Sequence, residues 1–303
     1  KGYEVIRDGI IAAEVDRVCE ALLRTSGRAL SEATPTVDAK LPRIEALPGL
    51  MGGARVKMIH PVIATGKYDV PSISIRLYQT APVHTEDIIR WEVAPAAAIE
   101  GILECVAKKA RFLVVGGTNT GKTTLLSALC NDGIYPGARI VKIEDPEEIW
   151  LNHEQVVTLE ARPAPPGSSV APYTIRDGVD DAMRMSPDWL IVGEVRTGDA
   201  ALTLFRAQMS DHPGLSTFHA ESPEFAIYRV GNLLISDTQE TDMRNARSTF
   251  AMAVDMIIQL GWVNQKRRIL GVWEIEKMLK DGEVIIHPLY TIGDEKMRAM
   301  TVR

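Results

Sequence analysis

Eight residues near the middle of the chain have the types and spacing of a phosphate-binding loop. Residues 116–123 read Gly-Gly-Thr-Asn-Thr-Gly-Lys-Thr, which matches the pattern G-x-x-x-x-G-K-[ST]. An apolar run at 111–115 precedes them and a helical pattern follows, which is the context that this motif requires. Glycines let the backbone wrap around phosphate oxygens, and the start of the helix adds the positive end of its dipole. The motif therefore predicts a nucleotide site.

Each position of this loop has an expected task. Lys122 reaches the β- and γ-phosphates of ATP, and the hydroxyl of Thr123 binds Mg²⁺. The other residues that we predict to bind the nucleotide are Gly116, Gly117, Thr118, Asn119, Thr120, Gly121 and Thr124. ATP and Mg²⁺ are accordingly the cofactors that the sequence predicts.

Two carboxylates, Glu144 and Glu194, stand at the ends of apolar runs that read as strands. In open parallel sheets, ligands bind at the carboxyl ends of the strands. We predict that Glu194 acts in hydrolysis and reaches a Mg²⁺-bound or attacking water, and Glu144 is the rival for polarising that water. The alternative is that such carboxylates cap helices or turns, which is the favoured interpretation for Glu147 and Glu148.

A histidine ends a further predicted strand. His219 follows the run Gly-Leu-Ser-Thr-Phe at 214–218. Most single histidines are structural or lie on the surface. The end of a sheet strand downstream of Glu194 is, however, close to the expected place of a γ-phosphate. Position alone leaves a phosphate sensor and a structural residue equally open.

The chain reads as two domains of unlike pattern. Residues 1–33 have apolar positions at helical spacing, and prolines and glycines then surround two predicted strands of a small mixed sheet, 55–63 and 72–78. We predict an N-terminal α+β domain with the start of a linker at 1–92, and an ATPase domain with a C-terminal appendage at 93–303.

The second domain is predicted to be α/β. Its predicted strands are 112–115, 139–144, 156–160, 189–195 and 214–218, and helices between them are 123–130, 174–185 and 199–210. This alternation indicates a parallel sheet covered on both faces. The appendage has three predicted strands, at 254–259, 269–276 and 284–289.

Composition narrows the classes of function. The net charge is −6, which gives no support to a protein whose main task is to grip a nucleic-acid backbone. No apolar run approaches the roughly 20 residues that span a bilayer, so we expect a soluble protein that meets a membrane only through partners. Cys19, Cys105 and Cys130 fit no disulfide or metal-ligand spacing and are expected to be core residues.

Four boxes taken together resemble one family. The phosphate loop is followed by Ile143-Glu144-Asp145, by 183–188 running into Val192-Gly193-Glu194-Val195-Arg196, and by Thr217-Phe218-His219-Ala220. This order resembles the type II/type IV secretion traffic ATPases, whose signatures are Walker A, Asp box, a Walker B with glutamate, and His box. The conjugal-transfer and type IV secretion (TrbB-like) branch is the most similar. The pilus and type II branch often carries a four-cysteine zinc element, which the three cysteines of this chain cannot form. The Glu-Asp-Pro of the Asp box is closer to the latter branch, and Asp211 stands where the family usually has glycine.

The resemblance implies a RecA-like P-loop NTPase domain with a smaller α+β N-terminal domain. It implies a homo-hexamer that hydrolyses ATP, is cytoplasmic and peripheral to the inner membrane, has inner-membrane components of a secretion or conjugation machine as partners, and binds no nucleic acid directly. Carried over to this sequence, Glu144 and Glu194 act in hydrolysis and His219 lies near the γ-phosphate. Arg76, in an Ile-Arg-Leu context, reaches the phosphates from the N-terminal domain, with a surface strand residue as the alternative.

Other functions remain open at this point. A pilus-assembly or type II secretion motor has the same chemistry in another machine. A RecA-like DNA translocase or helicase belongs to a different class, against which the acidic net charge counts. A nucleotide switch without catalysis is the third alternative.

Overall fold

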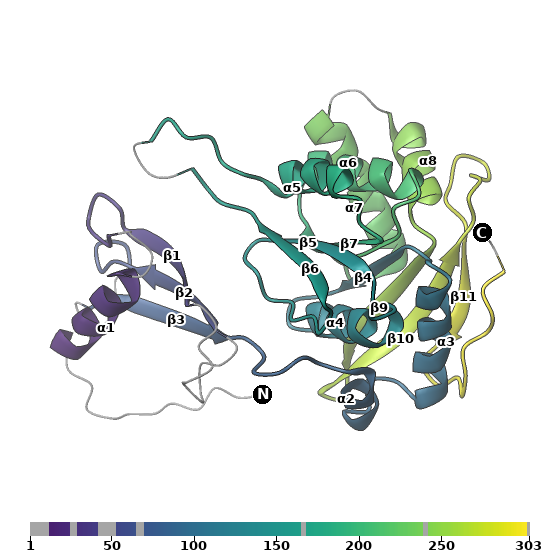
Figure 1. Cartoon of the computed structure of the whole chain (residues 1–303), viewed down its shortest axis with the longest axis horizontal. Coiled ribbons are helices and arrows are strands. Elements are labelled where there is room, and N and C mark those ends of the chain that lie inside the picture. The colour runs from purple at the N-terminus through teal and green to yellow at the C-terminus, as the bar shows by residue number, and fades with distance from the viewer. Residues whose placement is uncertain are drawn as a thin grey trace. The chain divides into compact units, whose positions relative to one another are not determined.

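The computed structural model describes residues 12–24, 29–41, 53–64, 70–164, 168–238 and 242–301. The chain forms two compact units, residues 1–81 and residues 82–303, and each is described by itself (Figure 1).

Residues 82–92 belong to the second unit, whereas the sequence analysis assigned them to the first domain. Two polar side chains hold the start of this segment. Asn131 Nδ2 donates a hydrogen bond to the carbonyl of Val83 at 2.9 Å. The backbone N–H and the hydroxyl of Thr85 both donate to Asp132 Oδ2 at 2.6 Å. The segment is therefore fixed to the second unit from its first residues.

In the described part of unit 1, one helix packs on a three-stranded antiparallel sheet. Its elements are α1 (Ala12–Arg24), β1 (Thr36–Leu41), β2 (Ala54–Ile59) and β3 (Ser72–Leu77), in the strand order β1-β2-β3. Alternate residues of β2 are buried, and Cys19 and Leu23 of α1 join the same core. The sheet is antiparallel where the sequence indicated a mixed one, and β1 is not among the predicted strands. Of the predicted helix at 1–33, residues 1–11 and 25–28 lie outside the described residues.

Unit 2 is built on an eight-stranded sheet in the order β11-β10-β9-β4-β8-β7-β5-β6. The strands are β4 (Phe112–Gly116), β5 (Arg139–Glu144), β6 (Gln155–Glu160), β7 (Trp189–Val195), β8 (Gly214–His219), β9 (Met256–Val263), β10 (Lys266–Ile275) and β11 (Ile286–Thr291). Strands β4 to β9 run parallel, while β10 and β11 are antiparallel additions at one end.

Helices cover both faces of this sheet (Figure 1). They are α2 (Thr85–Arg90), α3 (Ala96–Ala107), α4 (Lys122–Gly133), α5 (Ile175–Ala182), α6 (Gly198–Met209), α7 (Pro223–Thr238) and α8 (Met243–Ala253), with a 3₁₀ turn at Met183–Met185. Phe112 and Val114 of β4 face the core under α2, α3 and α4, whereas Leu113 and Val115 face the core under α5 to α8. A strand buried on both faces is apolar along most of its length, which explains the nearly continuous apolar runs. Among the described residues, no helix is both long enough and apolar enough to cross a membrane.

The predicted C-terminal appendage is part of the main sheet. Strand β9 pairs in parallel with β4, so that Phe112 lies opposite Met256. Strands β10 and β11 then extend the sheet through antiparallel pairs. Ile258, Ile269 and Val272 are fully buried in the second unit. Strand β9 is therefore an interior strand of the sheet, because it pairs with β4 on the side opposite β8.

All three cysteines are buried free thiols. Burial raises the pKa of Cys105 to about 11, and it also raises the pKa of Cys130. Both thiols therefore stay protonated at neutral pH and behave as small apolar side chains.

A partly buried ion cluster ties together the starts of β4 and β9. The backbone N–H of Arg111 donates to Asp255 Oδ2 at 2.7 Å, and its guanidinium donates to both carboxylate oxygens at 2.9 and 2.7 Å. Lys277 Nζ lies 2.5 Å from Asp255 Oδ1. Burial by itself would raise the pKa of Asp255, but Arg111 and Lys277 outweigh it, so the pKa is lowered. This cluster fixes the strand that leads into the phosphate loop.

We expect the Asp255→Asn variant to lower the free energy of unfolding by about 3 kcal/mol at pH 7, because two cations lose their partly buried counter-charge. The folded-state pKa of Asp255 lies below the unfolded value of about 4, so its stabilisation is complete above pH 4. It is lost as pH falls through the folded-state pKa. Urea titrations at several pH values should therefore show a deficit that shrinks below about pH 4.

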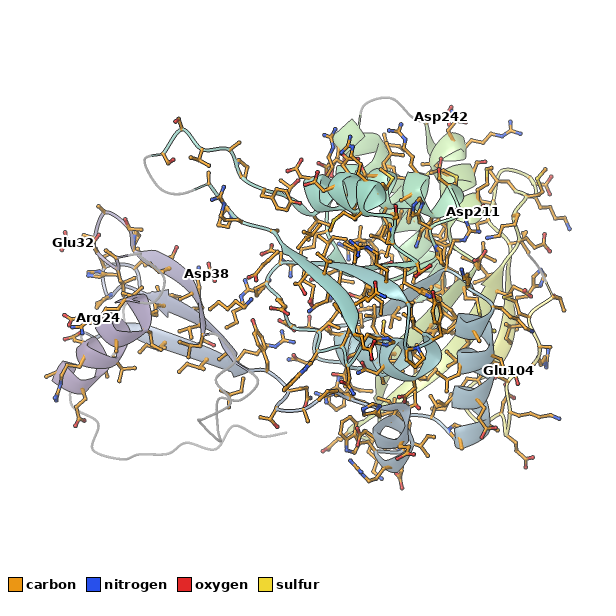
Figure 2. All side chains as sticks on the ribbon, in the orientation of Figure 1. Arg24, Glu32, Asp38, Glu104, Asp211 and Asp242 are labelled. Carbon is orange, nitrogen blue, oxygen red and sulfur yellow. The ribbon has the colours of Figure 1, made fainter. Side chains whose placement is uncertain are left out.

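The matched control is Asp211→Asn, at an exposed turn after α6 (Figure 2). It should leave the urea midpoint nearly unchanged. An Asp255→Asn variant as stable as the control would contradict the role of the cluster.

Candidate functional site

The phosphate loop leaves β4 and enters α4 through glycines that the backbone requires. Gly116 has φ +159°, and a Cβ there would lie 2.6 Å from both the carbonyl oxygen of Leu260 and the hydroxyl of Thr120. Gly121 precedes the first turn of α4 with φ +96°, a conformation that favours glycine. The loop is thus closely packed at its start and turns sharply at its end, as a backbone cradle for an anion must.

The side chains of the loop keep it in this shape. Lys122 Nζ donates to the carbonyls of Gly116 and Gly117 at 3.0 and 2.9 Å. The hydroxyl of Thr120 also donates to the carbonyl of Gly117, at 2.9 Å. Thr123 and Thr124 follow in the first turn of α4 and are half-buried, while Thr118 and Asn119 are exposed. The positive charge of Lys122 therefore lies at the loop, where phosphate oxygens would meet it.

The donor set of the loop fits a nucleotide phosphate with its metal. A helix N-terminus, an ammonium group and a threonine hydroxyl supply the types of donor and ligand that such a group needs. This set matches a nucleotide phosphate, and ATP with Mg²⁺ stays the predicted cofactor.

Arg267 of β10 is a loop contact that the sequence analysis missed. Its Nε donates to the carbonyl of Asn119 at 2.9 Å, and a Cβ at Gly121 would lie 3.5 Å from its Cδ. The guanidinium also stacks on Trp262 of β9, 5.2 Å from the ring centroid. The β9–β10 hairpin thereby holds the outer side of the phosphate loop.

Strand order brings the predicted residues to one edge of the sheet. Strands β4, β8, β7 and β5 are consecutive neighbours, and Gly116 pairs with His219 in the parallel register. Glu194 lies near the end of β7, and Glu144 is the last residue of β5. The carboxyl ends of these strands therefore gather residues that are more than a hundred positions apart in sequence.

Glu194 is partly exposed and has one close charged partner. Its side chain is 31% exposed, and Arg196 Nη2 lies 2.6 Å from Glu194 Oε2. Arg196 Nη1 also lies 3.6 Å from Asp145 Oδ2. Arg196 therefore forms an ion pair with Glu194.

Glu144 is buried and turned to its own strand and loop. Oε1 accepts hydrogen bonds from the backbone N–H groups of Glu148 and Ile149 at 3.0 and 2.9 Å, and Lys142 Nζ donates to Oε2 at 3.1 Å. Burial raises the pKa of Glu144, and the charge of Lys142 and the two N–H groups oppose the increase without cancelling it. Glu147 also accepts from Lys142, at 2.8 Å, so it pairs with a buried charge.

His219 is held through its backbone. Its carbonyl accepts a hydrogen bond from Arg229 of α7, and the Arg229 guanidinium lies 5.4 Å from the ring centroid of Phe218. Beside it, the hydroxyl of Thr217 donates to the carbonyl of Gly193 at 2.6 Å. The ends of β7 and β8 are therefore linked next to both Glu194 and His219.

Arg76 lies in unit 1, so its approach to the phosphates stays a prediction. It is an exposed residue of β3 and pairs in the antiparallel register with Arg55 of β2.

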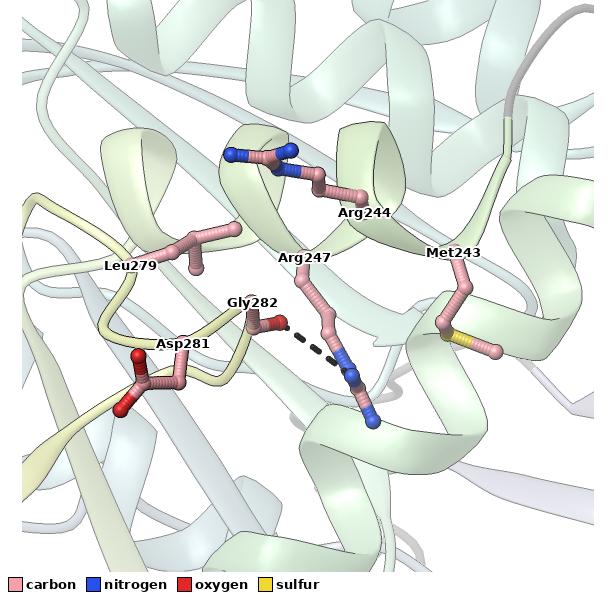
Figure 3. Close-up of a pocket in the computed structure, with 6 residues that line it drawn as sticks. All are labelled: Met243, Arg244, Arg247, Leu279, Asp281 and Gly282. Carbon is pink, nitrogen blue, oxygen red and sulfur yellow. Dashed lines mark hydrogen bonds between the residues drawn. The ribbon is translucent and has the colours of Figure 1, made fainter.

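A separate pocket lies between α8 and the turn that follows β10. It is lined by Met243, Arg244, Arg247, Leu279, Asp281 and Gly282 (Figure 3). Arg247 Nη1 donates to the carbonyl of Gly282 and lies 2.5 Å from Glu283 Oε1. None of the residues that the sequence analysis predicted for the site lines this pocket.

The chain matches one protein family and several curated proteins. The model of a family described as "Type II/IV secretion system protein" matches residues 6–265. A putative conjugal transfer protein of Mycobacterium tuberculosis is 30% identical over 294 residues, which cover 91% of this chain and 80% of that protein. The conjugal transfer protein TrbB of Rhizobium radiobacter is 29% identical over 282 residues, covering 90% and 80%.

Solved structures show the same fold. The ATPase DotB of Legionella pneumophila matches with a TM-score of 0.61 at 17% identity and covers 96% of this chain and 72% of its own. The pilus retraction motor PilT, solved with bound ADP, matches with a TM-score of 0.61 at 18% identity, covering 89% and 69%. The fold is thus the RecA-like α/β fold of secretion ATPases, with a smaller α+β unit before it, as the sequence analysis predicted.

The glycine of the Val192-Gly193-Glu194 box has a packing role that can be tested. A Cβ at Gly193 would lie 2.9 Å from Cγ of Glu144. We expect Gly193→Ala to lower the free energy of unfolding by roughly 1–3 kcal/mol, as overpacking of a core does. In a Glu144→Ala background the clashing atom is gone, so the same change should cost little. A double-mutant cycle from urea denaturation measures the difference, and equal costs in both backgrounds would contradict the contact.

Proposed function

Because the chain belongs to the type II/IV secretion system protein family, we propose that it is a ring-forming ATPase of a type IV secretion or conjugal-transfer system. The observation that carries the proposal is the shared sheet edge of the phosphate loop, Glu194 and His219. Phosphate binding and water activation need those groups together at the carboxyl ends of neighbouring strands. The relatives named as conjugal transfer proteins support this branch of the family.

Nucleotide binding would exchange contacts within the phosphate loop. Lys122 now donates to the carbonyls of Gly116 and Gly117, and phosphate oxygens would take over these hydrogen bonds. The N–H groups at the start of α4 add the positive end of the helix dipole. Mg²⁺, held by the hydroxyl of Thr123 and by Glu194 through water, would neutralise charge on the phosphates.

Hydrolysis requires a group that orients the attacking water and accepts its proton. Glu194 is suited to this task because its carboxylate is partly exposed at the sheet edge. Arg196 holds that carboxylate in place. His219 would contact the γ-phosphate from the adjacent strand, and Arg76 would add a bidentate contact from unit 1.

The assembled state and the place of work complete the proposal. We expect a homo-hexamer in the cytoplasm at the inner membrane, where hydrolysis moves parts of a secretion or conjugation machine. The partners are inner-membrane components of that machine. Nucleic acid is not bound directly, in keeping with the net charge of −6.

Two substitutions should separate binding from chemistry. Lys122→Ala removes the ammonium group that contacts the β- and γ-phosphates, so ATP affinity should fall by about tenfold or more and hydrolysis should cease. Glu194→Gln keeps size and hydrogen bonding but removes basicity, so binding should persist while kcat falls by about a hundredfold or more. A fluorescent ATP analogue and a phosphate-release assay measure the two quantities.

Lys108→Ala and Glu104→Gln are the matched controls, since both residues lie exposed at the end of α3 (Figure 2 labels Glu104). They should leave both quantities unchanged. Hydrolysis that persists in Lys122→Ala would refute the site.

Ring assembly makes a prediction of its own. Specific ATPase activity should rise with protein concentration and follow sedimentation of a roughly six-fold assembly in Mg-ATP, because the mass-action law links activity to the ring. An activity that is constant per chain, from a protein that sediments as a monomer, would leave a solitary P-loop enzyme and exclude the proposed motor.

A further inference from the structure

We propose that Glu144 is a positioning residue, that Lys142 holds it in place, and that the pair orients Glu194 for water activation. The inference rests on the proposed ATPase function and deepens it. It distinguishes between two carboxylates that the sequence treats as rivals. Its starting point is Lys142, a charged residue that stands between the fully buried Val141 and Ile143 of β5.

Lys142 is buried and fully bonded. Its side chain is 3% exposed. An ammonium group has three N–H donors. Nζ lies 3.1 Å from Glu144 Oε2, 2.8 Å from Glu147 Oε1 and 2.6 Å from the carbonyl oxygen of Ile149. Every donor therefore has an acceptor, which is the condition under which a protein tolerates a buried charge.

Glu144 completes the same cluster from the other side. Its side chain is 2% exposed, one oxygen binds Lys142, and the other accepts the N–H groups of Glu148 and Ile149. Both residues of the pair thus bind the far end of the loop 145–149 to the end of β5. The carboxylate of Glu144 therefore fixes the loop 145–149. Either oxygen would have to leave a buried partner before it could contact an incoming water.

Two lines of contact lead from this cluster to Glu194. The loop that Glu144 holds begins at Asp145, which lies 3.6 Å from Arg196, and Arg196 pairs with Glu194. On the neighbouring strand, a Cβ at Gly193 would lie 2.9 Å from Cγ of Glu144, so the residue before Glu194 packs on the buried side chain. A shift of Glu144 therefore moves both the backbone and the ion-pair partner of Glu194.

The charges make the two members interdependent. Removal of Lys142 leaves a buried carboxylate without its cation, and loss of the carboxylate leaves the ammonium group with less negative charge. Replacement of both by uncharged residues of similar size removes both buried charges, and Glu147, whose side chain is 24% exposed, remains within reach of water. Glutamine at 144 still carries an oxygen that can accept the two N–H groups of the loop.

The test compares Lys142→Met, Glu144→Gln and the double variant carrying both changes. Each single variant should lower kcat by about tenfold or more, because a small displacement of a catalytic group is costly. The double variant should recover kcat to within about threefold of wild type, with ATP affinity and KM nearly unchanged throughout. Lys108→Met is the control for loss of an exposed lysine and should behave as wild type.

A folded double variant that binds ATP yet stays as inactive as Glu144→Gln would overturn the proposal, because the carboxylate of Glu144 would then do the chemistry. Wild-type kcat in Lys142→Met would overturn it as well. If the double variant does not fold, the kcat of Glu144→Gln is compared with that of Glu194→Gln at saturating ATP. A kcat well above that of Glu194→Gln supports the positioning role, and a kcat that is equally low assigns the chemistry to Glu144.

Failure of the proposed function gives a different result. A wild-type protein without ATPase activity, or a fully active Glu194→Gln variant, would refute the function and this inference with it. An active wild type with an inactive Glu194→Gln variant and no rescue in the double variant refutes this inference alone.

Discussion

The parallel register of β4, β8, β7 and β5 is the constraint on which the rest of the molecule depends. Strands buried on both faces have no room for polar side chains along most of their length, so functional groups gather where the strands end. Gly116 lies beside His219 only because β8 is placed next to β4. The tight approach of Gly116 to Leu260 extends the same constraint to β9. One pairing pattern therefore decides both the shape of the phosphate loop and the identity of its neighbours.

Two clusters of charged side chains lie at opposite ends of the central strands, and the charges of each cluster are paired. Asp255 joins the starts of β4 and β9 through Arg111 and Lys277, and Lys142 joins the end of β5 to its loop through Glu144. An unpaired charge in either place would cost several kcal/mol, so each cluster specifies one arrangement of its strands and loops. The first cluster fixes the position of the strand that carries the phosphate loop. The second cluster fixes the position of the loop next to Arg196 and Glu194.

Local pattern predicted the central strands almost residue for residue, since β5 and β7 have the bounds that their apolar runs indicate. It placed β9 to β11 in an appendage, because a run of residues does not reveal which strand it pairs with. Arg267 was missed for the same reason: its contact with Asn119 joins residues 148 positions apart. Lys142 did leave a signal, since a lysine within a buried apolar strand requires an acidic partner, and Glu144 lies two positions away on the same face.

The partners of the two glutamates decide which one can move during catalysis. Glu194 pairs with Arg196, whose side chain is 51% exposed, and exposed ion pairs contribute only about 0–1 kcal/mol. Water can replace such a partner of the carboxylate at little cost. Glu144 would have to leave a buried ammonium group and two backbone donors, whose loss costs several kcal/mol before any chemistry begins. A carboxylate that must turn toward water in every cycle is better placed at position 194, and one that must never move is better placed at position 144.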